Sequence, residues 1–112
     1  HRRAFVFCGG KVTKTRFAGL TPWNCMPLLT SELPEQIASV GCDCTALVSF
    51  EENNGNDYLV IVNSDCFSKC TVSIDFKDMC YTIDRSGAFS EQQPGKRDFV
   101  LDEGDMLVVK YR

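Results

Sequence analysis

Seven cysteines carry the most varied chemistry in this chain, at positions 8, 25, 42, 44, 66, 70 and 80. Because their number is odd, they cannot all form disulfides within one chain. Cys42-x-Cys44 and Cys66-x3-Cys70 together could offer four thiolates to zinc, although zinc ligands are more often separated by two residues. A Cys66–Cys70 disulfide across a tight turn is an open alternative. We interpret the cysteines mainly as small, buried apolar side chains, and we expect no metal site.

Carboxylates are the second group that could do chemistry, because a glycosidase needs two of them facing a sugar. Most fall at expected turns, where aspartate caps backbone amides, and one lies on the wet face of an expected strand. Those at positions 102, 103 and 105 could also bind calcium, but the full set of oxygen ligands is not evident. We therefore predict no catalytic pair among these candidates, which are Asp65, Asp75, Asp84, Asp102, Glu103 and Asp105.

Two further catalytic arrangements are excluded by position. The only histidine is His1, so a Cys–His nucleophile pair would depend on a terminal residue. Gly9-Gly10 is not followed by the Gly-Lys-Ser/Thr of a phosphate-binding loop. We predict no catalytic residues and no cofactor.

Trp23 is the only tryptophan, and it lies between Pro22 and Pro27 in a segment that cannot pair regularly as a strand. An exposed ring there could stack on a sugar, with Asn24 as a polar neighbour. Alternatively, the ring could anchor the segment on the sandwich or on a neighbouring domain, since large aromatic side chains usually bury most of their area. Trp23 and Asn24 are therefore the predicted contacts to a glycan or to another domain.

The elements that position these residues are strands, because apolar and polar residues alternate from residue 45 onward. Asn54-Gly55 predicts a hairpin turn, and residues 58–62 are apolar on both faces, as in a central strand. Residues 84–97 are polar and predict a solvated loop. In the less regular first 40 residues, a short helix could open at Ser31. Residues 12–17 are a weaker candidate, because Lys14 and Arg16 share the face of Val12. The expected strands are residues 4–7, 37–40, 46–51, 58–62, 71–76, 79–83, 99–101 and 106–111.

This spacing of strands and turns indicates an antiparallel sandwich or barrel, and we predict an all-β sandwich of about seven to eight strands. The length of 112 residues, with 44% hydrophobic and 24% charged residues, suits one domain over residues 1–112 with a single modest core. A net charge of −3 argues against a nucleic-acid partner. No apolar run is long enough to cross a membrane. Because the chain opens on His1-Arg2-Arg3 without a methionine, we expect it to come from a longer protein.

Several motifs resemble one family of domains. They are ALVSFEE at 46–52, YLVIVNSD at 58–65, TVSIDF at 71–76, YTIDRSG at 81–87 and FVLDEGDML at 99–107. In this order they resemble the small C-terminal β-sandwich that follows the catalytic (β/α)8 barrel in many glycoside hydrolases, especially those secreted by gut Bacteroidetes. The number of cysteines departs from that family.

The resemblance implies a non-catalytic accessory domain that packs on the barrel of the same polypeptide, in a periplasmic, secreted or cell-surface protein. Apolar residues in the irregular stretch exceed what a small sandwich must bury and could form the inter-domain face. The alternatives are an independent carbohydrate-binding module that uses Trp23, and a protein-interaction domain of a cell-surface complex. The residues of the expected inter-domain face are Leu20, Trp23, Met26, Leu28 and Leu29.

Overall fold

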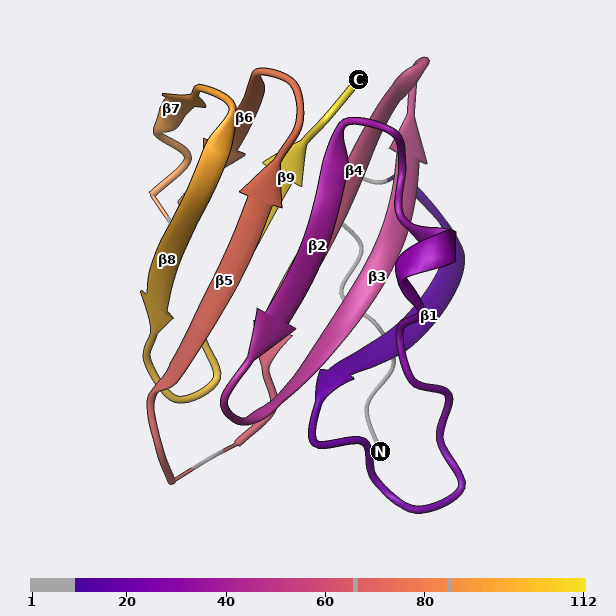
Figure 1. Cartoon of the computed structure of the whole chain (residues 1–112), viewed down its shortest axis with the longest axis vertical. Coiled ribbons are helices and arrows are strands. Elements are labelled where there is room, and N and C mark those ends of the chain that lie inside the picture. The colour runs from indigo at the N-terminus through magenta and orange to yellow at the C-terminus, as the bar shows by residue number, and fades with distance from the viewer. Residues whose placement is uncertain (1–9, 66, 85) are drawn as a thin grey trace.

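The computed structural model describes residues 10–65, 67–84 and 86–112, which form an all-β structure of two antiparallel sheets (Figure 1). One sheet has six strands in the order β1-β3-β4-β9-β6-β7, and the other has three in the order β2-β5-β8. This confirms the predicted fold class, with nine strands in the described residues. Their bounds are β1 Lys11–Gly19, β2 Ile37–Cys42, β3 Thr45–Asn53, β4 Asn56–Asn63, β5 Cys70–Phe76, β6 Cys80–Ile83, β7 Phe89–Gln92, β8 Gly95–Leu101 and β9 Met106–Lys110.

The β3–β4 hairpin forms as its turn residues predict. Asn54 and Gly55 have φ angles of 54° and 83°, which lets a two-residue turn join strands in the register Asn53↔Asn56. β4 lies between β3 and β9 and is buried on both faces, which confirms it as a central strand. Its Leu59 and Ile61 belong to the core between the sheets, while its Tyr58 and Val60 pack on the opposite face.

The core between the two sheets uses the inward residues of both. Alternation is cleanest in β5, where every second residue is buried. Asn63, at the end of β4, adds a buried polar centre, because its Nδ2 donates to Ser68 O at 2.9 Å, Asp102 O at 3.1 Å and Leu101 O at 3.2 Å. This side chain therefore joins β4 to both neighbouring loops at one end of the sandwich.

The expected solvated loop over residues 84–97 is wrong in part, because it contains all of β7 and the start of β8. Both are edge strands whose outward residues face solvent, so their sequence shows no apolar alternation. The short helix considered at Ser31 is a three-residue 3-10 turn, η2 (Thr30–Glu32), with Leu29 at its N-cap position. The strand expected at residues 4–7 lies outside the described residues.

β1 contains a bulge, which makes its alternation of apolar and polar residues hard to interpret from the sequence. The pairing with β3 shifts between Val12 and Lys14, so Val12 pairs with Glu51 while Lys14 pairs with Phe50. Beyond this bulge, Lys14 and Arg16 share the face of Ala18, which belongs to the core. The Lys14 ammonium lies 4.8 Å from the centre of the Phe50 ring, and Arg16 Nε lies 2.8 Å from Glu32 Oε2. Both half-buried cations, Lys14 and Arg16, therefore have an interaction partner at the edge of the sheet.

Candidate functional site

The segment of residues 20–29 connects β1 to η2 and projects beyond one end of the sandwich (Figure 1). Four of its apolar side chains are exposed: Leu20 at 69%, Trp23 at 91%, Met26 at 58% and Leu29 at 54% of their maximum areas. Four such side chains on one short segment form the first candidate surface, which we call the 20–29 segment.

Trp23 and Asn24 are the two central residues of a tight turn. The amide of Cys25 donates to Pro22 O at 3.1 Å and closes this turn. Asn24 has a φ of 66°, a left-handed conformation that asparagine tolerates better than most residues. The exposure of Trp23 at the tip rules out the alternative that its ring anchors the segment on the sandwich. Asn24 contributes to this turn through its left-handed backbone conformation.

The backbone behind this turn is fixed on β1. The amide of Phe17 donates to Met26 O at 2.9 Å, and the amide of Leu28 donates to Phe17 O at 2.7 Å. Pro27 thereby forms a parallel bridge with Phe17. Leu28 is half-buried and packs on the core, so it belongs to the sandwich, unlike the four exposed side chains that we expected beside it. The segment therefore presents its apolar residues from an ordered base.

Glu32 secures the other end of the segment. Its Oε1 accepts a hydrogen bond from the amide of Leu29 at 3.0 Å, and its Oε2 lies 2.8 Å from Arg16 Nε and 3.9 Å from Lys14 Nζ. The hydrogen bond from Leu29 is the main cause that holds the pKa of Glu32 below its ordinary value of 4.5, and the two cations add to it. A carboxylate that is charged at neutral pH thus ties η2 to β1.

The predicted carboxylate candidates do not come together as a metal site. A groove of about 560 Å³ is lined by Asp84, Asp98 and Asp105 together with apolar residues of β8 and β9. Asp84 Oδ1 accepts bonds from the hydroxyl and amide of Ser86 and the amide of Ala88, and these bonds, that of the Ser86 hydroxyl first, lower the pKa of Asp84. Within the described residues, no three acidic side chains lie close enough to share an ion.

The remaining carboxylate candidates have local structural contacts. Asp65 Oδ1 accepts from the amide of Phe67 at 2.8 Å, and Asp102 Oδ1 lies 3.8 Å from Lys69 Nζ. Asp75, in β5, pairs with Ser39 of β2 and Lys96 of β8, and Glu103 is exposed in the turn before β9. Neither the groove described above nor a smaller, polar one beside Tyr111 is lined by Trp23 or Asn24.

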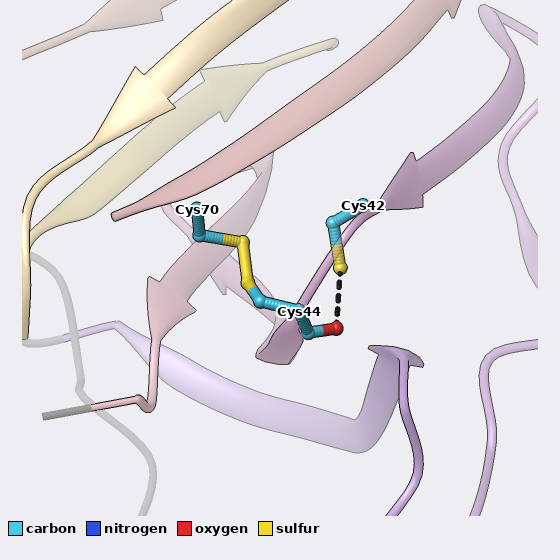
Figure 2. A group of neighbouring side chains, drawn as sticks. All are labelled: Cys42, Cys44 and Cys70. Atoms are coloured by element: carbon cyan, nitrogen blue, oxygen red, sulfur yellow. Dashed lines mark hydrogen bonds between the residues drawn. A yellow bond between two sulfur atoms is a disulfide. The ribbon is translucent and has the colours of Figure 1, made fainter. Parts of the chain in front are cut away.

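The cysteines form the second candidate site, drawn in Figure 2. Cys44 immediately precedes β3 and is bonded to Cys70, the first residue of β5, with 5.6 Å between their Cα atoms. The disulfide therefore joins the two sheets. It also shows that the alternative of a Cys66–Cys70 disulfide was wrong, since Cys70 pairs across 26 positions of sequence. Cys8 and Cys66 lie outside the described residues.

Cys42, at the end of β2, lies beside this disulfide as a free thiol. Its Sγ donates to Cys44 O at 3.2 Å, and the sulfurs of Cys42, Cys44 and Cys70 all lie within 4.8 Å of one another. Burial, with the nearby carboxylate of Asp43 as a lesser cause, raises the pKa of Cys42. The thiol is therefore protonated at neutral pH. The spacing Cys42-x-Cys44 was visible in the sequence, but the approach of Cys70 depends on the packing of the sheets.

Other free cysteines are divided between surface and core. Cys25 is exposed in the 20–29 segment. Cys80 is buried, and burial raises its pKa to about 11. The interpretation as small, buried side chains is thus confirmed for Cys80 and wrong for Cys25. Cys44 and Cys70 are buried as a disulfide.

Comparison with protein-family models, with curated proteins and with solved structures finds no match to this chain. Residues 10–65, 67–84 and 86–112 contain no helix with the length and hydropathy that a membrane crossing requires.

Proposed function

We propose that this chain is a non-catalytic accessory domain that packs on the catalytic barrel of a glycoside hydrolase and stabilises it. The observation that carries the proposal is the 20–29 segment, whose apolar side chains are exposed on an ordered backbone outside the core. Burial of a leucine or methionine side chain contributes about 1.5–3 kcal/mol, so this segment could contribute substantially to an inter-domain contact. The order of strand motifs in residues 46–107 supports the choice of partner.

The same proposal places the parent protein outside the cytoplasm, in the periplasm or at the cell surface. The Cys44–Cys70 disulfide supports this location, because such bonds persist mainly in oxidising compartments.

The second candidate function is glycan binding by Trp23. The exposure of its ring at the tip of a turn favours this alternative. Against it, Asn24 serves the turn, and neither described groove includes the ring. Docking on a protein surface needs only apolar contact, so the observations favour an inter-domain role.

The first test follows the fluorescence of Trp23, which reports on this segment alone because the chain has no other tryptophan. The isolated chain is titrated with a panel of soluble plant and host glycans. We expect an unchanged spectrum and ready access of an aqueous quencher to the ring. A saturable spectral shift, together with a heat of binding in calorimetry that disappears in Trp23→Ala, would instead establish the carbohydrate-binding module.

The second test uses the whole polypeptide that contains this chain. We expect Trp23→Ala and Leu29→Ala to lower the melting temperature of its catalytic barrel by several degrees, because each removes inter-domain contact area. Phe67→Ala is the matched control, since Phe67 is 85% exposed but lies outside the segment. The proposal would be contradicted if the polypeptide contains no barrel. It would also be contradicted if all three substitutions leave the melting temperature of the barrel unchanged.

A further inference from the structure

The sulfur cluster of Cys42, Cys44 and Cys70 offers chemistry that the accessory role does not use. Its members come from the end of β2, the residue before β3 and the start of β5, so both sheets position them. All three sulfurs lie within 4.8 Å of one another (Figure 2). We propose that reduction of the Cys44–Cys70 disulfide converts this cluster into a three-thiolate site for a thiophilic divalent cation such as Zn²⁺.

The spacing of the sulfurs supports this proposal. Thiolates bind Zn²⁺ at about 2.3 Å in tetrahedral geometry, which separates two thiolates on one ion by about 3.8 Å. The third sulfur, from Cys42, already lies within 4.8 Å of both members of the disulfide. Opening the disulfide therefore needs only a local separation of Cys44 Sγ from Cys70 Sγ, and the fourth position is left to water.

The surroundings hold Cys42 in place and leave a path for an ion. Gly19 lies against the cluster, and a Cβ at this position would be 2.5 Å from Cys42 Sγ. The absence of a side chain there gives the sulfur its room. Cys44 and Cys70 are 7% and 0% exposed, whereas Cys42 is half-buried, so the cluster is reached from the side of Cys42.

The oxidised and reduced forms differ by two electrons, which a dithiol supplies. One thiolate of the dithiol attacks one sulfur of the Cys44–Cys70 bond, forms a mixed disulfide and releases the other cysteine. The second thiol of the reductant then displaces the first cysteine, so the reductant becomes a cyclic disulfide and its two protons remain on Cys44 and Cys70. Binding of the cation releases the three thiol protons to solvent. The site is therefore closed by oxidation and opened by reduction.

The test uses the full chain with Cys8→Ser and Cys66→Ser, so that the described cysteines are the only thiols. The protein is reduced with a dithiol, and the dithiol is then removed under anaerobic conditions. The reduced protein is titrated with Co²⁺, which absorbs strongly when thiolates bind it. We expect one equivalent of Co²⁺ to bind the reduced form, none to bind the oxidised form, and added Zn²⁺ to displace it. Zn²⁺ should also raise the melting temperature of the reduced form.

Substitutions identify the ligands. Cys42→Ser and Cys42→Ala should each weaken Co²⁺ binding at least about tenfold, because a third thiolate is lost. Cys25→Ser, which removes an exposed free cysteine elsewhere, should leave the affinity unchanged. Three results would overturn the site: a reduced, folded chain that binds no Co²⁺, equal affinity in the Cys42 variants, or loss of the β-sheet circular dichroism on reduction alone.

Discussion

Gly19 is the residue whose identity is most strictly set by its neighbours. It has a φ of 76°, and a Cβ there would lie 2.0 Å from Cys44 O and 2.5 Å from Cys42 Sγ. The left-handed backbone alone costs a non-glycine residue about 1–3 kcal/mol, and the contact with a backbone oxygen adds to this cost. The short distances to Cys44 O and Cys42 Sγ therefore require glycine at this position independently of its positive φ.

We therefore expect Gly19→Ala to lower the free energy of unfolding by more than about 3 kcal/mol. Gly55→Ala is the matched control, because Gly55 also has a positive φ of 83° but meets nothing within 4 Å of a Cβ. It should cost only about 1 kcal/mol. Urea denaturation of the two variants measures the difference, and equal losses would show that the contact with Cys44 O is relieved at little cost.

Single residues also show where sequence reasoning stops. The prolines beside Trp23 predicted an irregular surface segment, but the sequence left open whether the ring itself is exposed or anchored, and the structure leaves it 91% exposed. Asn63 gave no signal in the sequence, although its side chain donates to the carbonyls of Ser68, Leu101 and Asp102, because these partners are up to 39 positions away. The pairing of Cys44 with Cys70 was equally hidden, since it depends on which strands face each other across the core. Contacts of this kind require the packing of the sheets.

At the scale of the element, η2 and β1 fix the base of the 20–29 segment through Glu32. The pKa of Glu32 is lowered in the folded chain, chiefly by the hydrogen bond from Leu29. A lowered pKa means that the stabilising contact is fully present above the ordinary pKa of 4.5 and is lost as the pH falls through the folded-state value. Acid should therefore loosen the segment.

We expect the fluorescence anisotropy of Trp23 to fall as the pH is lowered below 4.5, because the ring gains mobility when Glu32 is protonated. In Glu32→Gln the anisotropy should already be lower at neutral pH, and its acid dependence should be reduced. Glu35→Gln, which changes an exposed carboxylate nearby, is the control and should behave as the unsubstituted chain. An identical acid response in Glu32→Gln would contradict the role of Glu32.

Elements were predictable where one face is buried and the other is wet. The β3–β4 hairpin and β5 follow directly from period-two alternation and from Asn54-Gly55. β7 and the start of β8 were missed because edge strands with solvent-facing residues have the composition of loops. β1 was weak in sequence because its bulge breaks the alternation between Val12 and Lys14. Each failure has a local structural cause.

At the scale of the whole molecule, the Cys44–Cys70 disulfide is a covalent cross-link between side chains of the two sheets. It closes a loop spanning 26 positions, for which the entropy lost by the unfolded chain corresponds to about 3–4 kcal/mol. We expect reduction, or the double substitution Cys44→Ala with Cys70→Ala, to lower the free energy of unfolding by about this amount without unfolding the sandwich.

Urea denaturation with and without a dithiol measures this effect. The double variant should no longer respond to the dithiol, whereas Cys25→Ser should respond as the unsubstituted chain does. Unchanged stability on reduction would mean that the disulfide adds nothing to the packing of the sheets. In an oxidising compartment the same bond would keep the proposed cation site closed.

The lateral edges of the sheets in the described part of the chain are β1, β7, β2 and β8. β1 and β2 each have a register shift, β7 has only four residues, and β8 exposes the charged side chains of Lys96 and Asp98. Bulged, short or charged edges oppose the addition of a strand from another molecule. Growth of intermolecular sheets is thus discouraged, and the solubility of concentrated preparations should depend on how many apolar side chains remain at the tip around Trp23.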